Sequence, residues 1–184
     1  MVTSREREVK LQIRDYEKVK ETILRAGLKY TDTCLEEDYY YSHPCIDLST
    51  TDEALRARKR RCNSSEHYTI TYKGPRLIEE SGLKTRLELE VELTSSQWGI
   101  IRSIIEKLGF NVVAKVSKAR ALYTSHCVNA YLDELLGVGF YLELEIKCES
   151  GEELVKKILV ELSSSAQLVH ETYLEICLKT KKCT

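Results

Sequence analysis

Charged and apolar residues alternate without a break in the stretch Arg86-Leu-Glu-Leu-Glu-Val-Glu-Leu93. Successive side chains of a β-strand point to opposite faces, so this stretch predicts a strand with one charged face and one apolar face. The charged face carries Arg86, Glu88, Glu90 and Glu92. The apolar face must pack against another element, while the charged face must meet water or opposite charges.

The same alternation recurs before and after this stretch. The further charged faces carry Glu6, Glu8 and Lys10; Arg56, Arg58 and Arg60; Lys118 and Arg120; and Glu143, Glu145 and Lys147. About eight strands are predicted, most of them antiparallel to their neighbours: Arg5–Ile13, Glu36–Ser42, Ala54–Arg61, Glu66–Lys73, Lys84–Leu93, Asn111–Tyr123, Cys127–Asp133 and Phe140–Lys147.

Three amphipathic helices are predicted between the strands, each with start and stop signals or an apolar stripe. They run from the cap Asp15 to Gly27, from a cap at Thr94 or Ser95 to Gly109, and from about Glu152 to Leu162. Their inward residues should include Val19, Ile23 and Leu24; Trp98, Ile101, Ile104, Ile105 and Leu108; and Leu154, Ile158, Leu159 and Leu162. The apolar stretch from Gln167 to Leu178 is a candidate fourth helix, followed by a solvated basic tail.

Length and composition favour one folded domain. The chain has 184 residues, of which 42% are hydrophobic and 31% charged, with only 8 Gly and 2 Pro. These values exclude a disordered chain and predict a single domain over residues 1–184. We expect no membrane-spanning segment and no export signal, because no apolar run approaches about 18 residues and the N-terminus lacks a hydrophobic region.

Cysteine spacing and net charge indicate in which compartment the protein is expected and which partners it is not expected to bind. The seven cysteines are odd in number and include no C-x-x-C pair, so we expect neither a disulfide framework nor a thiolate zinc site. This pattern predicts a cytoplasmic protein. The net charge of −1 gives no bulk attraction to nucleic acid or to a membrane, so neither is an expected partner.

The charged faces allow two arrangements. An antiparallel sheet could expose them to solvent, or it could close into a barrel in which they line a water-filled tunnel. Carboxylates repeat within a strand and so do guanidinium groups, and like charges side by side repel. That clustering favours the tunnel, because a divalent cation would compensate the carboxylates and a polyanion would compensate the basic residues.

The ordered motifs of this chain resemble those of the CYTH proteins, or triphosphate tunnel metalloenzymes. The resemblance extends from Glu6 to at least Glu145, although Val138 and Tyr141 depart from the usual Leu and Phe. The matching motifs are Glu6-x-Glu8-x-Lys10, Asp38-x-Tyr40, Arg56-x-Arg58, Tyr72-Lys73-Gly-Pro75, Arg86-x-Glu88-x-Glu90, Lys118-x-Arg120, Asp133 and Gly139-x-Tyr141-x-Glu143-x-Glu145. The resemblance implies an α+β fold, a closed antiparallel eight-stranded barrel with helices packed outside.

The resemblance also implies roles for the charged residues. Mg²⁺ or Mn²⁺ would be bound by Glu6, Glu8, Glu143 and Glu145, with Asp133 close by. The phosphates of a triphosphate-bearing small molecule would be held by Lys10, Arg56, Arg58, Lys73, Arg86, Lys118 and Arg120. Catalytic roles would fall to Lys10, Glu88 and Glu90. Arg60 and Glu92 are interpreted instead as solvated charges.

Three functions are compatible with this sequence. The first is a metal-dependent triphosphatase acting on inorganic triphosphate or other short triphosphate compounds. The second is a class IV adenylyl cyclase, which would also require a pocket that orients the nucleoside. The third is a non-catalytic polyphosphate- or nucleotide-binding module. The sequence favours the hydrolase and leaves open whether the chain forms a homodimer.

Overall fold

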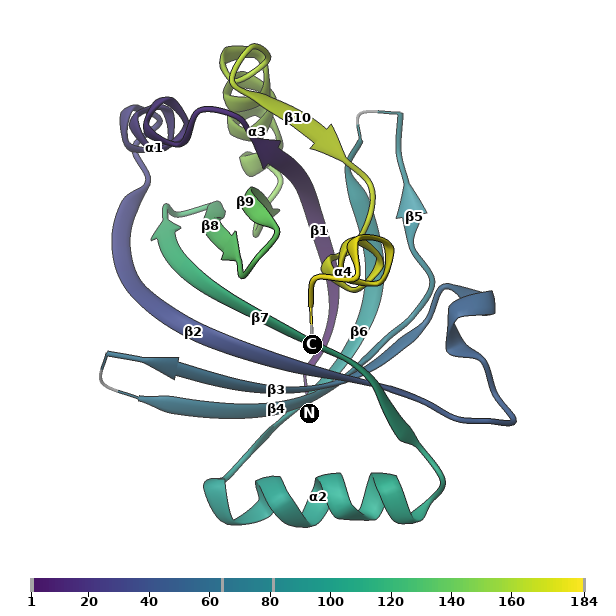
Figure 1. Ribbon diagram of the computed structural model, residues 1–184. Coiled ribbons are helices and arrows are strands. Elements are labelled where there is room, and N and C mark those ends of the chain that lie inside the picture. The colour runs from purple at the N-terminus through teal and green to yellow at the C-terminus, as the bar shows by residue number, and fades with distance from the viewer. Residues whose placement is uncertain (1, 64, 81, 184) are drawn as a thin grey trace.

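Eight antiparallel strands close into the barrel that the sequence predicts (Figure 1). The computed structural model describes residues 2–63, 65–80 and 82–183. The barrel strands are β1 (Val2–Ile13), β2 (Lys29–Ser42), β3 (Ala54–Cys62), β4 (Glu66–Lys73), β6 (Lys84–Leu93), β7 (Asn111–Thr124), β8 (Val128–Leu135) and β9 (Gly139–Ile146). Their order is β1-β9-β8-β7-β2-β3-β4-β6, and β6 pairs with β1 to close the ring.

Two short strands extend this ring where the sequence predicts none. Strand β5 (Leu77–Ile78) pairs with β6, and β10 (Ala166–Val169) pairs with the end of β1. The prediction of a single helix over residues 167–178 is therefore wrong for the first part of that stretch, which contains β10. Its second part forms helix α4 (Tyr173–Thr180), capped by Thr172.

Two predicted helices cover one side of the barrel, where Figure 1 shows them together. Helices α1 (Tyr16–Arg25) and α3 (Gly151–Glu161) pack against the outward apolar faces of the strands. The shared core contains Val9 and Leu144 from the barrel, and Val19, Ile23 and Ile158 from the helices. None of the helices in the described ranges is long and apolar enough to cross a membrane.

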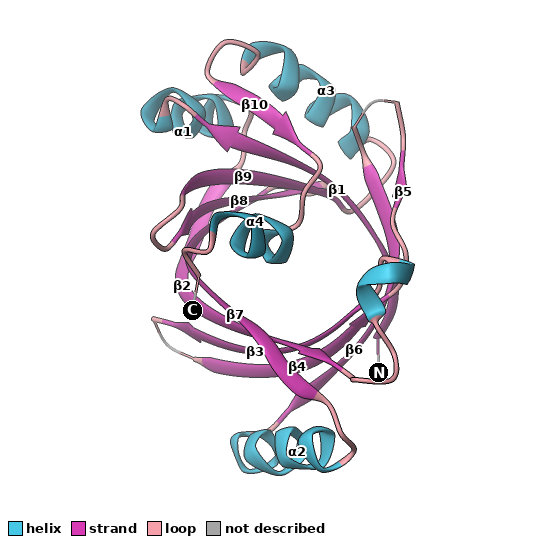
Figure 2. Cartoon of the chain, turned by 45° about the vertical axis from the view of Figure 1, so that its right-hand side comes forward, coloured by secondary structure: helices cyan, strands magenta, loops and turns pink. Residues whose placement is uncertain are grey.

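Helix α2 (Ser95–Lys107) lies outside the opposite wall and is less buried than its sequence predicts (Figure 2). Its cap is Thr94, which forms a reciprocal capping box with Gln97. Trp98 is its anchor, as its ring lies 5.2 Å from the ring of Tyr68.

Three residues predicted to face inward point to solvent instead: Leu24 of α1, and Ile104 and Leu108 at α2. Helix α1 buries Val19 and Ile23 in the core, and Tyr16 and Ala26 pack beside them, so Leu24 is left on the solvent side. Helix α2 contacts the barrel along a narrow line through Trp98, so its opposite side stays exposed.

Disulfides contradict the expectation drawn from cysteine spacing. Six of the seven cysteines pair as Cys34–Cys62, Cys127–Cys148 and Cys177–Cys183. The first of these bonds forms because the barrel makes Cys34 on β2 the register partner of Cys62 on β3. The cysteine pattern therefore gives no ground for a reducing compartment.

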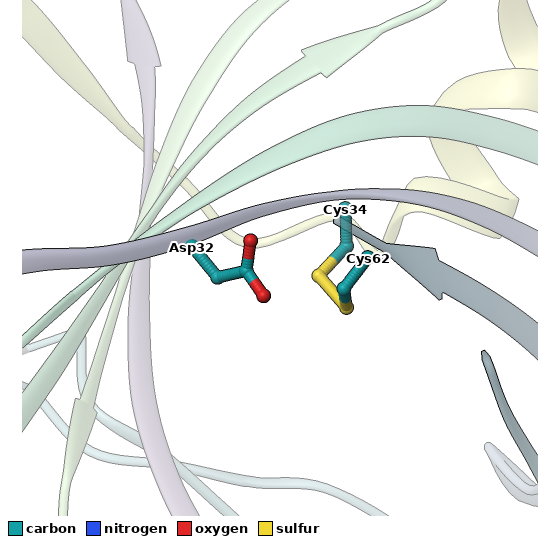
Figure 3. A group of neighbouring side chains, drawn as sticks. All are labelled: Asp32, Cys34 and Cys62. Atoms are coloured by element: carbon teal, nitrogen blue, oxygen red, sulfur yellow. A yellow bond between two sulfur atoms is a disulfide. The ribbon is translucent and has the colours of Figure 1, made fainter. Parts of the chain in front are cut away.

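Asp32 lies beside the Cys34–Cys62 bond, as Figure 3 shows. An acid and two sulfurs could bind a soft metal only if the sulfurs were thiolates. Because the two sulfurs are bonded to each other, this group is not a metal site in the described structure.

Removing the Cys34–Cys62 bond should destabilise the barrel without unfolding it. The bond closes a loop with a sequence separation of 28, and closing a loop of that size stabilises a fold by about 3 kcal/mol. Denaturant unfolding of the double variant Cys34→Ser/Cys62→Ser should show that loss. Cys45 is free and exposed, so Cys45→Ser is the matched control and should behave as wild type. Equal stability of all three proteins would show that the bond does not form in solution.

Candidate active site

The barrel encloses a cavity of about 350 Å³ with a mostly charged lining. Figure 2 shows α4 beside the open end of the barrel. The site residues expected from the sequence line this cavity, except Asp133: Glu6, Glu8, Lys10, Arg56, Arg58, Lys73, Arg86, Glu88, Glu90, Lys118, Arg120, Glu143 and Glu145. Their shared position follows from alternation, because each lies on the inward face of its strand.

Four carboxylates gather where β1 meets β9. The strands are antiparallel, and their register places Glu8 opposite Glu145 and Lys10 opposite Glu143. Directly opposed residues in such a pair have Cα atoms about 4.5–5.5 Å apart, so the side chains on one face are neighbours. Glu6 precedes Glu8 by two residues, so its side chain lies on the same face of β1. The register thus turns two separate E-x-E motifs into one acidic group.

Glu8 is the member of this acidic group without a direct ion pair, although its register partner on β6 is Lys84 and the charges of Lys10 and Lys73 also act on it. Within the described residues, Glu8 forms no salt bridge and no hydrogen bond through its side chain. Burial, and then the charges of Glu6 and Glu143, raise the pKa of Glu8 to about 8. Burial also acts on Glu143, but Arg120 and Lys10 outweigh it and lower the pKa of Glu143 to about 2.

The acidic group fits a divalent cation. Mg²⁺ and Mn²⁺ prefer hard oxygen ligands, and carboxylates are the donors that this corner of the cavity offers. A cation here would also supply the direct ion pair that Glu8 lacks. The donor chemistry and the charge imbalance therefore agree with the metal that the sequence implies.

The basic residues on the other side of the cavity are held by two carboxylates behind them. Asp38 on β2 accepts hydrogen bonds from Nε and Nη2 of Arg58 at 2.5 and 2.7 Å. Glu36 on the same strand accepts from Nε of Arg60 at 2.6 Å, and its other oxygen lies 3.0 Å from Nζ of Lys118. These contacts hold Arg58, Arg60 and Lys118 in place, and all three side chains also line the cavity.

Glu36 and Asp38 were not among the predicted site residues. A signal existed, since both belong to the inward face of a predicted strand and Asp38 matches an Asp-x-Tyr motif. The interpretation of Arg60 as a solvated charge is also wrong, because Arg60 lines the cavity and pairs with Glu36. Burial opposes ionisation of Glu36, but Arg58, Lys118, Arg120 and Arg60 outweigh it and hold its pKa well below the ordinary 4.5.

Asp133 is a fully buried partner of Arg120. Its two oxygens accept from Nε and Nη2 of Arg120 at 2.7 and 2.6 Å, and one also accepts from the hydroxyl of Tyr173 at 2.6 Å. Asp133 does not line the cavity. Its carboxylate therefore orients Arg120, which in turn contacts Glu143.

Tyr173 attaches helix α4 to the cavity. Its ring lies 4.0 Å from Nζ of Lys10, a cation–π contact, while its hydroxyl reaches Asp133. Arg76, which also lines the cavity, joins this helix to the segment before β3, since it lies 2.8 Å from Glu175 of α4 and 2.7 Å from Asp52. The sequence does not reveal these contacts, because they join segments that lie far apart along the chain.

The third wall comes from β4 and β6. Lys73 bridges Glu6, at 3.3 Å, and Glu88. Burial, and then a hydrogen bond with Glu6, raise the pKa of Glu88 to about 7, although Lys73 opposes the shift. Glu90 accepts a 2.7 Å hydrogen bond from Thr71. Arg86 donates to the Gly74 carbonyl at 2.6 Å.

Lys84 is a cavity cation that the sequence interpretation missed. Its Nζ is buried and has no hydrogen-bond partner among the described residues. Burial, and then the charge of Lys10, lower the pKa of Lys84 to about 8, and together they outweigh the opposing charges of Glu8 and Glu143. Its alternation with Arg86 and Glu88 on one strand face could have identified it.

Comparison with known proteins decides the family. The profile of the CYTH domain matches residues 4–175. The chain belongs to the CYTH domain family. A Methanocaldococcus jannaschii protein provisionally named an adenylate cyclase, MJ0240, is 34% identical to it over 177 residues, covering 92% of this chain and 96% of that protein.

Solved structures agree with this assignment of the CYTH chain. The PH1819 protein of Pyrococcus horikoshii OT3 is 34% identical, with a TM-score of 0.80 over 94% of this chain and 99% of that one. HpAC1 from Hippeastrum, described as a candidate adenylyl cyclase with a dominant triphosphatase activity, is 17% identical, with a TM-score of 0.72 over 97% of each chain. CYTH proteins are generally enzymes, triphosphatases or cyclases.

Replacing Glu36 should reveal how much the buried ion pairs stabilise the CYTH barrel. Because the folded-state pKa of Glu36 is lowered, its stabilisation is complete above the ordinary 4.5 and is lost as the pH falls toward the lower folded value. Glu36→Gln should therefore lower the free energy of unfolding by about 3 kcal/mol at pH 7 and by progressively less below pH 4.5.

Denaturant unfolding at a series of pH values measures this difference. Glu21→Gln, on the exposed side of α1, is the control and should match wild type at each pH. A Glu36→Gln variant that is as stable as wild type at pH 7 would contradict the ion-pair account.

Proposed function

We propose that this protein is a divalent-metal-dependent triphosphatase that hydrolyses inorganic triphosphate or other short triphosphate compounds. We further propose that residues 1–184 act as one catalytic domain. The observation that carries the proposal is the enclosed cavity itself, where an acidic group on β1 and β9 faces a basic group on β3 and β7. Phosphoryl transfer depends mainly on positioning and on neutralising phosphate charge, and such a cavity offers both.

The proposed ligands of Mg²⁺ or Mn²⁺ are Glu6, Glu8, Glu143 and Glu145. When bound, the cation would neutralise phosphate oxygens and polarise the phosphorus that is attacked. Asp133 is proposed as a positioning residue and not as a direct ligand, since it does not line the cavity and its oxygens accept from Arg120 and Tyr173.

The proposed phosphate-binding residues all line the cavity: Lys10, Arg56, Arg58, Lys73, Arg86, Lys118 and Arg120. We add Lys84, whose buried and unpaired ammonium would gain its missing partner from a phosphate oxygen. Arg58 and Lys118 are already fixed by Asp38 and Glu36, so they would bind phosphate with little loss of conformational entropy.

Glu88 and Glu90 are proposed to orient and deprotonate the attacking water. Both lie on the inward face of β6, next to the Arg56 side chain, whose Nη2 is 3.6 Å from Glu90. Lys10, in contact with Tyr173 and 3.3 Å from Glu143, would stabilise the charge that develops on the transferred phosphoryl group.

The cyclase is the second candidate, favoured by the name of MJ0240 at 34% identity. Cyclisation requires that the nucleoside be held so that its 3′-hydroxyl reaches the α-phosphate. The uncharged lining offers only a few groups, among them Tyr40, Tyr131 and Leu174. The hydrolase needs no such pocket. HpAC1, similar in fold, is described as predominantly a triphosphatase.

A substrate panel tests the proposal. Purified protein with Mg²⁺ or Mn²⁺ is given inorganic triphosphate, ATP or thiamine triphosphate, and both phosphate and cyclic nucleotide are measured. We expect phosphate release that stops on chelation. Cyclic AMP as the main product from ATP would establish the cyclase, whereas tight metal-independent binding without turnover would establish a binding module.

Loss of one acidic ligand should abolish most of this turnover. Glu6→Gln removes a negative charge from the proposed metal site, and kcat for triphosphate should fall at least about 100-fold. Glu17→Gln, exposed on α1, is the control and should retain wild-type kcat. Equal rates for the two variants would contradict the metal role of Glu6.

Replacing Lys84 should have opposite effects on the stability of the fold and on the binding of triphosphate. Lys84→Met deletes a buried ammonium that has no hydrogen-bond acceptor and whose burial outweighs the attraction of Glu8 and Glu143, so the free energy of unfolding of the ligand-free protein should rise by about 1 kcal/mol. KM for triphosphate should rise at least about tenfold, since a charged contact is lost. A less stable variant with unchanged KM would mean that Lys84 supports the fold and not the ligand.

A further inference from the structure

Helix α2 presents an apolar face to solvent on the outside of the barrel. Ile100, Ile104 and Leu108 have exposed fractions of 61%, 48% and 66%. Trp98, on the other side of the helix, contacts the barrel. The helix therefore has apolar residues on both sides, whereas a surface helix normally carries polar residues on its outer side. A chain that is 31% charged has ample polar residues for such a position.

This outer face consists of two parallel rows. Large residues at intervals of four form one row, and small residues at the same interval form the row beside it. The large row is Ile100, Ile104 and Leu108, and the small row is Ser95, Gly99 and Ser103. Rows of residues four apart form the ridges and grooves by which helices pack together.

No contact among the described residues requires a glycine at position 99. A glycine inside a helix destabilises it relative to alanine, so a helix-interior glycine usually reflects a close approach by another group. A Cβ added at Gly99 would meet nothing within 4 Å. The backbone at Gly99 is therefore open to solvent and accessible to close approach by a second molecule.

We propose that two copies of this chain pair through α2, antiparallel and related by a two-fold axis between residues 101 and 102. Ile100 of one copy then lies level with Ser103 of the second copy, and Ile104 lies level with Gly99. Leu108 approaches Ser95 at each end. Each level thus combines a large side chain with a small one, and the same patch serves on both copies, as two-fold symmetry requires.

Charge and area are compatible with a second copy. Lys107 is the charged residue nearest the two rows, and the antiparallel arrangement places the two Lys107 side chains at opposite ends of the interface. The same arrangement sets the two helix dipoles antiparallel, which is electrostatically favourable. A helix of 13 residues is only about 20 Å long, less than an interface of about 800 Å² per copy needs. Further exposed apolar residues flank the helix in the sequence, Val91 before it and Val112 and Val113 after it, and they are available to enlarge the interface.

The pairing leaves the cavity open to its ligand. Helix α2 lies outside the barrel wall, whereas α4 lies beside the opening (Figure 2). The proposal is thus independent of the proposed catalytic activity, and either can fail without the other.

Sedimentation velocity of the full chain over a range of concentrations tests the pairing. Wild type should be a dimer at about 100 µM and dissociate on dilution. Gly99→Leu fills the small row without a clash inside its own chain, so it should stay folded by circular dichroism while its dimer dissociation constant rises at least about tenfold. Val160→Leu, an exposed position on α3, is the control and should dimerise as wild type does.

A charge pair tests the register. Ile100→Glu alone and Ser103→Lys alone should each weaken the dimer. The two changes together should restore it, because the carboxylate introduced on one copy would then lie level with the ammonium introduced on the second copy. A monomeric wild type at about 100 µM, including one that binds phospholipid vesicles instead, would overturn the proposal. So would a Gly99→Leu variant that dimerises normally, or a double variant as weak as the singles.

Discussion

Keeping many ionised side chains inside one closed barrel is the constraint on which this structure depends. An isolated buried charge is very costly, and a carboxylate beside a carboxylate costs more. The barrel meets the constraint by register, which places Asp38 opposite Arg58 and Glu36 opposite Lys118. Most cations on this wall are therefore compensated before any ligand arrives.

The compensation is incomplete at two places, and these two places define what the cavity can bind. Within the described residues Glu8 forms no ion pair and Nζ of Lys84 has no hydrogen-bond acceptor, although the two residues are register partners on β1 and β6. The pKa of each is shifted to about 8, from opposite directions, because burial disfavours both charges. A cation at the first and a phosphate oxygen at the second would relieve both. Metal and polyphosphate are thus complementary to the charges that the fold leaves unmatched.

Much of the fold could be predicted from the sequence, because alternation is a local property. The runs at Glu6–Lys10 and Arg86–Leu93 fix which side chains face inward, and barrel closure brings them together. Contacts between distant segments could not be predicted. The Cys34–Cys62 bond depends on the register of β2 with β3, and the contact of Tyr173 with Asp133 depends on where α4 docks. The exposed side of α2 was missed because an apolar stripe does not show whether its partner lies in the same chain.

The most direct test of the central claim is a crystal structure with a non-hydrolysable triphosphate analogue and Mn²⁺, using anomalous scattering to locate the metal. The account predicts a manganese peak among Glu6, Glu8, Glu143 and Glu145, with the phosphate chain in the same cavity against Arg56, Arg58 and Lys84. A phosphate chain bound outside the barrel, or manganese bound away from these carboxylates, would contradict it.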